Sequence, residues 1–463
     1  MLTFLKQARE LRSVTFIVCV AGILGGCKVG PNYARPTIPA PPQFRAAQPQ
    51  TDTASLGDIK WFDLFQDEVL RQLIQQSLDS NYDVQMAAQR IIAAEGQFRA
   101  TRSGLFPQFG AEAGASRVGL NSPIESTGGI YGTASWEIDL FGKLRRATEA
   151  ARADLLSDEE NRKAVIQTLV SQVAAAYFSL REYDAEIDYV QLSIQTRQES
   201  LRLVTSREAG GVASLVDVDQ AKTLVQSAQA DLSQLERDRE QTENYINVLL
   251  GRPPGPVMRG RNLVDQNQPP QVPAGLPSAL LERRPDLRAA EQRLIAANAR
   301  VGVAKAAFFP SINLTATGGY QTTDLLGVIN RSGFSYTMNG VVDLPIFDAG
   351  RRSGNYTTAK AVRDELVLDY QKTINDAFRD VSDALIGYQK NKETTATKTL
   401  LAGTLRDQSQ LANQRYAGGV TSYLEVLDTE RQRLTAEREL AQSQRDVLTS
   451  LVQLYSALGG GWQ

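Results

Sequence analysis

One stretch of this sequence occurs twice, and the duplication limits the folds that the chain can adopt. Residues 89–109 (QRIIAAEGQFRATRSGLFPQF) align with residues 292–312 (QRLIAANARVGVAKAAFFPSI) at a constant offset of 203 positions. Further along, GGVASLVDVDQA from Gly210 matches GGVTSYLEVLDT from Gly418 at an offset of 208. Two matches of this kind indicate two copies of one structural unit rather than several unrelated domains. We therefore expect the 463-residue chain to form one duplicated fold.

Each copy is predicted to run in the order helix, two strands, long helix, turn and long helix. Apolar residues of the first long segment recur at three- and four-residue spacing, as in an amphipathic helix: Ile166, Leu169, Val170, Val173, Ala174, Tyr177 and Leu180. No proline interrupts residues 143–207 or 351–415, and helices of that length reach roughly 100 Å. Rods of this length suit a coiled assembly better than a globular core. The glycine pairs Gly210-Gly211 and Gly418-Gly419 predict tight turns between the long helices.

Four stretches alternate between apolar or small residues and polar ones: 107–117, 130–138, 311–320 and 334–343. Alternation over about ten residues is typical of a membrane β-barrel strand, although a half-buried soluble sheet gives the same pattern. Four strands cannot close on themselves, because even a small filled barrel needs about eight. Open edges in lipid would leave backbone groups unpaired, so the strands must be completed by other copies of the chain. Two copies would give a nearly filled barrel of eight strands, whereas three would give twelve strands and a lumen, which favours a trimer.

The N-terminus is predicted to be a targeting segment. A basic start precedes the apolar run Val14–Leu24, which has the features of a secretory signal and is shorter than the ~20 residues needed to span a bilayer. Small residues then lead directly into Cys27, and this arrangement resembles the lipobox of bacterial lipoproteins. We expect residues 1–26 to be removed and Cys27 to be lipidated, with an ordinary cleaved signal as the alternative. By the same resemblance, Lys28 favours sorting to the outer membrane.

The composition excludes many kinds of catalytic chemistry. The chain has no histidine, which removes Ser-His and Cys-His nucleophile systems and imidazole metal sites. Its 50 Lys and Arg residues against 52 Asp and Glu residues argue against a nucleic-acid partner. The two cysteines, Cys19 and Cys27, cannot make a disulfide framework. We expect no enzyme activity, no catalytic residue, no metal site and no cofactor other than the covalent lipid on Cys27.

Taken together, these features resemble the TolC family of outer-membrane efflux ducts, and within it the lipidated OprM/NodT-type branch. The stretches that carry the resemblance run from Cys27 to Gly459: CKVGPNYARP from Cys27, WFDLFQDEVLRQLIQQSLDSNYDVQMAAQRI from Trp61, the FP junctions at Pro107 and Pro310, LPSALLERRPDLRAAEQ from Leu276, and the GGV turns. The resemblance implies a mainly α-helical homotrimer. Its 12-stranded outer-membrane β-barrel would continue as a long α-helical barrel through the periplasm.

The expected organisation divides the chain into five segments. They are a lipoprotein signal peptide (1–26), a lipidated extension (27–60), a first repeat (61–251), a Pro-rich linker (252–277) and a second repeat (278–463). The residues themselves indicate only a linker between the repeats. The resemblance implies that this linker and the chain ends gather as an equatorial belt around the helices.

The resemblance also implies the function and partners. The trimer would be the exit duct of a tripartite efflux system, passively conducting drugs or other small molecules from an inner-membrane pump and a periplasmic adaptor to the outside. A type I secretion duct and a non-channel coiled-coil lipoprotein scaffold are the alternatives. The lipidated branch implies a proton-driven transporter and a role in multidrug resistance. The sequence leaves the exported compounds and the cognate pump open.

Finally, the resemblance assigns a periplasmic gate to residues near the turns: Tyr416, Leu424, Glu425, Asp428, Arg431 and, in the first copy, Asp217. Carboxylates such as Glu425 and Asp428, brought together by threefold symmetry, repel one another unless they are screened, protonated or paired. The turns themselves would dock the adaptor: Gly210, Gly211, Val212, Gly418, Gly419 and Val420. The alternative is that these charges form the solvated face of an amphipathic helix. Thr421 stands where TolC itself has an arginine that locks the closed state, so that bridge is not expected here.

Overall fold

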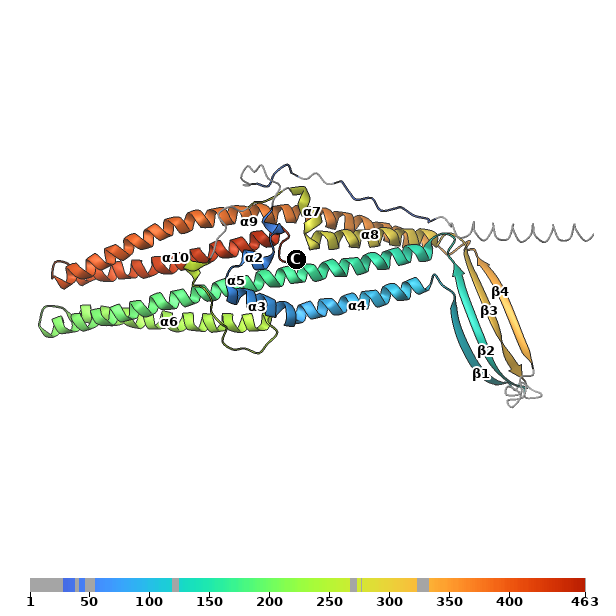
Figure 1. Cartoon of the computed structure of the whole chain (residues 1–463), viewed down its shortest axis with the longest axis horizontal. Helices are drawn as coiled ribbons and strands as arrows, with labels where there is room; N and C mark the ends of the chain where they lie inside the picture. Colours follow the sequence, from blue (N-terminus) through green and yellow to red (C-terminus); the bar gives the residue numbers. More distant parts are fainter. Residues whose placement is uncertain are drawn as a thin grey trace, which may run out of the picture. The chain divides into compact units, whose positions relative to one another are not determined.

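The computed structural model describes residues 28–37, 41–45, 55–118, 125–266, 273–275, 277–322 and 333–462, and the predicted signal peptide and Cys27 lie outside them. The first repeat contains η1 (Leu56–Asp58), α2 (Trp61–Leu64), α3 (Glu68–Ser80), α4 (Tyr82–Ser103), β1 (Gln108–Val118), β2 (Glu125–Ile138), α5 (Lys143–Ala209) and α6 (Leu215–Leu249), followed by η2 (Leu263–Asp265) (Figure 1). The second contains η3 (Pro277–Ala279), α7 (Leu280–Arg283), α8 (Pro285–Ala306), β3 (Ser311–Thr322), β4 (Phe334–Asp343), α9 (Arg351–Ala417) and α10 (Tyr423–Ala457).

The duplication predicted from the sequence is confirmed by the helices. The two long helices, α5 and α9, have 67 residues each, and their antiparallel partners, α6 and α10, have 35 each. Both long helices end within two residues of the predicted position. Each repeat therefore builds the same helical hairpin from a different sequence.

The chain divides into two compact units, and neither of them is a single repeat. The sheet unit contains residues 1–38, 89–159 and 289–372, and the hairpin unit contains residues 39–88, 160–288 and 373–463. All four strands belong to the sheet unit, and both helical turns belong to the hairpin unit. Each unit thus draws its elements from both halves of the sequence.

All four predicted strands are present, and they form one antiparallel sheet in the order β1-β2-β3-β4. The middle pair, β2 and β3, joins the two repeats. Strand β2 begins at Glu125 rather than at the predicted Ile130. Its backbone pairing with β1 continues through Gly128 and Gly129, where the absence of side chains hides the alternation. Within the described residues, β1 and β4 are paired on one side only.

Residues 28–37, the N-terminal strap, lie against the sheet unit directly after the predicted lipid-bearing residue. Arg146 of α5 is 1% exposed, and its Nη2 donates to Asn32 Oδ1 (2.8 Å) and to the carbonyl of Gly30 (3.3 Å). Gly30 has a φ of 100°, and a Cβ built there would lie 2.5 Å from the Cα of Gly302. Only glycine fits this close approach. The strap is therefore fixed along its backbone.

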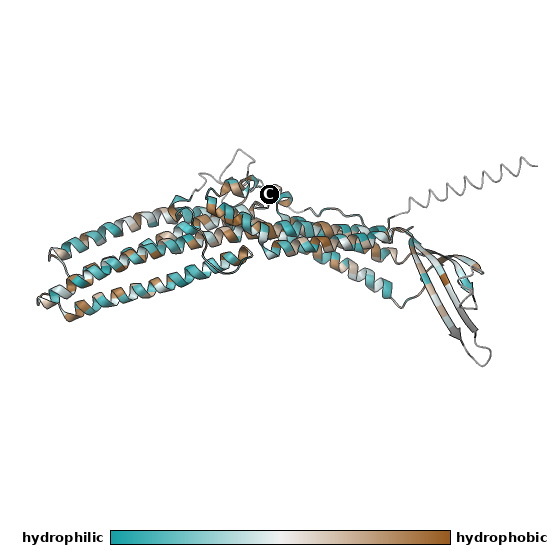
Figure 2. Cartoon of the chain, turned by 60° about the horizontal axis from the view of Figure 1, so that its bottom comes forward, coloured by the Kyte–Doolittle hydropathy of each residue, from teal (hydrophilic) through white to brown (hydrophobic). Residues whose placement is uncertain are grey.

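The core of the hairpin unit confirms the predicted amphipathic face of α5. Val173, Tyr177 and Leu180 are completely buried there, together with Ile74 of α3 and Leu454 of α10. Figure 2 shows hydrophilic residues along the whole length of the helices. In the part of the chain that the structure describes, none of the helices has the length and apolar character needed to cross a membrane.

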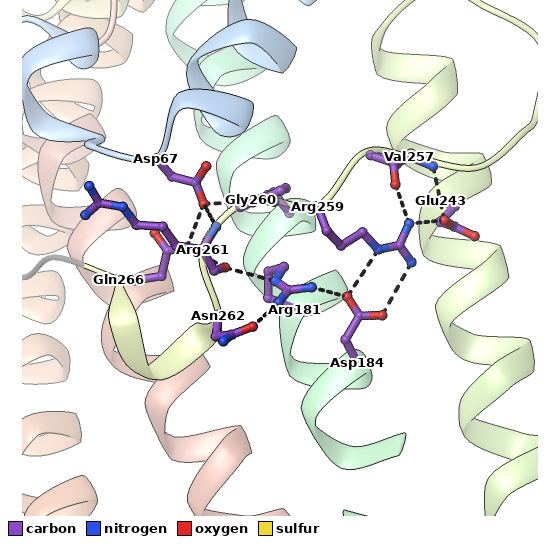
Figure 3. A network of polar contacts seen from close by, with 11 residues as sticks. Asp67, Arg181, Asp184, Glu243, Val257, Arg259, Gly260, Arg261, Asn262 and Gln266 are labelled. Atoms are coloured by element: carbon purple, nitrogen blue, oxygen red, sulfur yellow. Dashed lines mark hydrogen bonds and ion pairs between the residues drawn. The ribbon is translucent and has the colours of Figure 1, made fainter. Parts of the chain in front are cut away.

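A buried carboxylate fixes the chain that follows α6 (Figure 3). Asp67 caps α3 by accepting from the backbone NH of Val69 (3.0 Å). Its other oxygen, Oδ2, accepts from the hydroxyl of Tyr177, the NH of Arg261 and the side chain of Gln266, each at 2.8 Å. Burial alone would raise the pKa of Asp67, but hydrogen bonds from Gln266 and Tyr177 outweigh it and lower the pKa. The charged carboxylate therefore holds helix and linker together.

Arginines complete this network (Figure 3). Arg259, in the predicted linker, donates to Asp184 of α5 (3.2 Å) and also pairs with Glu243 of α6. Arg181 of α5 donates to Asn262 Oδ1 (2.7 Å). The described part of the predicted linker up to residue 266 is thus bound to α3, α5 and α6 rather than freely solvated.

Buried carboxylates also connect α5 with α10. Glu186, 1% exposed, accepts from Arg438 (2.8 Å) and Gln442 (2.9 Å). One turn earlier, Glu182 is 3% exposed and lies 3.4 Å from Nε of Arg445. Burial raises the pKa of Glu182 to about 7; Arg445 opposes the shift and Glu186 adds to it.

This raised pKa predicts a pH-dependent stability. The pKa of Glu182 is about 7 in the folded chain and ordinarily 4.5, so the folded state binds more protons and loses stability as the pH rises between these values. The variant Glu182→Gln cannot ionise. In circular-dichroism melts of detergent-solubilised protein, we expect it to unfold at a higher temperature than the wild type at pH 8, with little difference at pH 5.

The exposed Glu199 on the same helix supplies the control, because Glu199→Gln should behave alike at both pH values. A gain from Glu182→Gln that was equal at pH 5 and pH 8 would contradict the interpretation.

Candidate functional site

The strand register places the predicted apolar residues on one face of the sheet. Ile130 pairs with Tyr320, which pairs with Phe334, while Phe109 stands opposite Ala134. The exposed fractions of Phe109, Phe334 and Ile130 are 82%, 61% and 54%. Large apolar side chains that stay this exposed among the described residues of a sheet are typical of contact with lipid.

The opposite face of the same sheet is polar. Its side chains form rows across three strands: Thr133, Thr317 and Thr337 in one row, and Ser135, Thr315 and Asn339 in the next. Toward β1, Tyr131 of this face stands opposite Glu112. Hydroxyl, amide and carboxylate groups bind water well. The sheet therefore has one face suited to lipid and one suited to an aqueous lumen.

The second candidate region is at the tips of the two helical hairpins, where both turns have the same backbone geometry. The NH of Val212 donates to the carbonyl of Arg207 (2.8 Å), and the NH of Val420 donates to that of Arg415 (2.9 Å). Gly211 and Gly419 have φ values of 71° and 73°, which favour glycine. Val212 and Val420 are 80% and 71% exposed. Each turn thus presents an exposed valine on a hydrogen-bonded backbone of the same geometry, and docking at these turns stays a prediction.

Asp217, the predicted gate residue of the first repeat, has a local structural role. Its backbone NH donates to Ser214 Oγ (3.2 Å), and its carboxylate accepts from the NH of Ser214 (2.9 Å). This is a capping box that stabilises the start of α6. The carboxylate of Asp217 is therefore committed to its own helix.

Glu425 occupies the matching position in the second repeat but makes different contacts. Its carboxylate pairs with Arg415 across the turn (3.3 Å) and accepts from the hydroxyl of Thr421. Ser422, the residue before α10, makes no side-chain cap. The longer Glu side chain thus joins the two helices of one hairpin, so the repeats differ in chemistry where they agree in backbone.

Tyr416 lies in a contact between the two hairpins. It is 6% exposed, and its ring centroid is 5.2 Å from that of Tyr423. The guanidinium of Arg207, from the first hairpin, lies 4.4 Å from the centre of the Tyr416 ring. Its Nη2 donates to the carbonyls of Tyr416 (3.1 Å) and Ala417 (3.2 Å), at the end of α9, where intrahelical partners run out. Arg207 therefore connects the two hairpins at their tips.

The other predicted gate residues lie on the exposed side of α10. Leu424 is 67% exposed, and Asp428 pairs with Arg431 at 2.8 Å on the surface. A hydrogen bond from Arg431 lowers the pKa of Asp428. Roles of these residues in a gate stay predictions, as does lipidation of Cys27, which lies outside the described residues. No cluster of three or more Asp, Glu or Cys side chains in the described ranges could hold a metal ion.

Sequence reasoning missed the two arginines, Arg207 and Arg415. Each looks like an ordinary surface charge near a helix end, because its partner lies in another part of the sequence or across a turn. The signal that identifies them is their equivalence, since both stand three residues before the glycine pair of their repeat.

Comparison with known proteins identifies the kind of molecule that has these features. The sequence model of the family described as "Outer membrane efflux protein" matches residues 73–252 and 276–460 of this chain. The toluene efflux pump outer membrane protein TtgC of Pseudomonas putida is 37% identical, covering 97% of this chain and 96% of that protein. The cation efflux system protein CusC of Escherichia coli is 33% identical, with 96% and 98% covered.

Solved structures agree with these relatives. A crystal structure of CusC superposes with a TM-score of 0.85 at 32% identity, covering 94% of this chain and all of that one. The open state of the Neisseria gonorrhoeae outer membrane channel MtrE gives a TM-score of 0.86 at 31% identity, with 94% and 99% covered. Fold and sequence thus point to the same family.

The contact between hairpins predicts the effect of Arg207→Met, which keeps the aliphatic stem but removes the charge. Loss of the cation–π contact and two hydrogen bonds should reduce the free energy of association between the two hairpin tips by about 1–2 kcal/mol. With spin labels at Val212 and Val420, we expect double electron–electron resonance to report a broader distribution of tip distances. Arg202, exposed on the same helix, supplies the control variant Arg202→Met. An unchanged distribution for Arg207→Met would show that the contact does not hold the tips.

Proposed function

This chain belongs to the outer membrane efflux protein family, and we propose that it forms the passive exit channel of an efflux system, through which small molecules cross the outer membrane. The observation that carries the proposal is the two-faced sheet. Its register gathers polar side chains on one face and large apolar ones on the other across all four strands. Such a sheet separates water from lipid.

The channel is proposed to be a homotrimer. One chain supplies four strands whose outer edges, β1 and β4, have partners on one side only within the described residues. Unpaired backbone groups cost several kcal/mol each in hydrocarbon, so identical chains would pair edge to edge until the ring closes. Three chains of four strands give twelve, which encloses a lumen, whereas eight strands leave little room.

We propose that the tips of the hairpins meet a periplasmic adaptor protein, which couples the channel to an inner-membrane transporter. The exposed Val212 and Val420 support this, because they offer an apolar contact on two turns of the same backbone geometry. The lipid proposed on Cys27 would add a membrane anchor beside the barrel.

The cargo is proposed to be chosen by the pump. Relatives of similar identity to this chain are named for toluene and for cations, so a shared channel body accompanies chemically different cargo. A wide aqueous lumen lined by hydroxyl and amide groups discriminates little between small solutes.

Two adjacent residues of β4 test the channel wall. Met338 is on the apolar face and Thr337 on the polar face. A lysine on a lipid-facing site near the middle of the bilayer costs about 2–4 kcal/mol, whereas a lysine in a lumen is solvated. We expect Met338→Lys to reduce the amount of heat-dissociable trimer in the outer membrane. Thr337→Lys should assemble normally and shift the ion selectivity measured in planar bilayers toward anions.

The channel proposal would be contradicted if both lysine variants formed equal amounts of trimer, or if intact trimers showed no conductance. The matched pair controls for general damage to β4, because the two substitutions are the same and lie one residue apart.

The predicted gate is tested by the double variant Glu425→Ala and Asp428→Ala. Removing both carboxylates frees Arg415 and Arg431 and takes negative charge from the proposed closed tip. We expect a higher conductance of the closed channel and a weaker block by divalent cations in planar bilayers. Asp219→Ala, at a carboxylate exposed on the first hairpin, is the control. Unchanged currents through intact trimers would remove Glu425 and Asp428 from the gate.

A further inference from the structure

The duplicated sheet contains one junction between repeats, and that junction lies inside the chain. Strand β2, the last of the first repeat, pairs with β3, the first of the second repeat, from Gly128 opposite Thr322 to Ile138 opposite Ile312. The outer strands β4 and β1 are likewise the last of one repeat and the first of the other. If two copies of this chain meet edge to edge, they bring the same kinds of strand together in the same order.

An aromatic stack closes the junction inside the chain. Phe141 follows the end of β2, and Phe309 precedes the start of β3. Their ring centroids are 4.7 Å apart, with an angle of 24° between the ring planes. The two rings therefore meet where β2 and β3 leave the sheet and become helices.

Both rings have counterparts in the other repeat. Phe309 stands directly before Pro310, as Phe106 stands before Pro107. Phe141 is the first residue of the pattern Phe-x-x-x-Arg-Arg at the start of α5, and Phe347 begins the same pattern at the start of α9. The four phenylalanines therefore form two equivalent pairs in the duplicated sequence.

Among the described residues, neither counterpart stacks on another aromatic ring, and both are more exposed than Phe309. Phe347 is 88% exposed and Phe106 is 56% exposed, whereas Phe309 is 37% exposed. An aromatic side chain left almost fully exposed beside an open strand edge marks an interaction surface. The duplication indicates what covers it, because the in-chain junction is a template for the missing one.

We propose that Phe347 of one copy stacks on Phe106 of the next copy and closes the β4–β1 junction, as Phe141 closes on Phe309 inside the chain. The partner is a second copy of this chain, and the inference rests on the proposed homotrimer. In that assembly the rim between sheet and helices carries one aromatic stack at every junction between repeats, three within chains and three between them.

Cross-linking tests the pairing directly. In the full-length protein, Phe106→Cys combined with Phe347→Cys is treated with a short bismaleimide, with the single variants alongside to account for Cys27. We expect covalent dimers and trimers that survive heating in SDS. Phe141→Cys with Phe309→Cys is the matched control, because its cross-link lies within one chain and leaves the monomer mass. Intact trimers that cross-link no more than the single variants would overturn the pairing.

Thermal dissociation supplies a second measurement that does not depend on thiol geometry. Phe106→Ala and Phe347→Ala should each lower the temperature at which the trimer dissociates, and the double variant should dissociate no earlier than the worse single variant. Ile346→Ala, beside Phe347 and 91% exposed, should have little effect. Additive effects, or none, would overturn the stack while leaving the trimer. A wild-type protein that is monomeric by native mass spectrometry would overturn the proposed function as well.

Discussion

The assembly of this molecule depends on the unpaired backbone groups at the two edges of its sheet. Within the described residues, β2 and β3 are paired on both sides, but β1 and β4 are paired on one side only and leave a row of backbone groups open. In water such edges would be a site of aggregation, and in hydrocarbon they would be too costly to leave open. In the proposed homotrimer, pairing between identical chains would satisfy both edges and enclose the polar face of the sheet. Assembly of the trimer would then also form the channel.

The two repeats share a backbone but differ in their side-chain contacts. Two copies of one unit give helices of equal length and turns of equal geometry, so the backbone is nearly twofold repetitive. Side chains then separate the repeats. The equivalent arginines have taken different partners, since Arg207 reaches the other hairpin and Arg415 stays within its own. The duplication thus determines the backbone, and sequence differences between the repeats at single positions determine the specific side-chain contacts.

The sequence predicted most of the fold because strands and long helices follow local rules. Alternation and proline-free periodicity depend on neighbouring residues, and the bounds of α5 and α9 agree with the prediction closely. Long-range polar contacts were not predictable in this way. Arg207 finds its acceptors more than 200 positions away, and Asp67 captures the chain after α6 at a similar separation. Asp217 shows the reverse case, since its capping box with Ser214 is local but was overlooked beside the analogy with Glu425.

The two turns of each chain agree in backbone geometry but differ in side chains, and this has a consequence for stoichiometry. In a trimer, three chains would form a ring of six turns around the threefold axis. The six turns would share one backbone geometry, but their charged side chains would repeat only three times. A binding protein that recognised the glycine-valine backbone alone would find six equal positions. One that recognised the Arg415–Glu425 pair would find three, with a second class of positions between them.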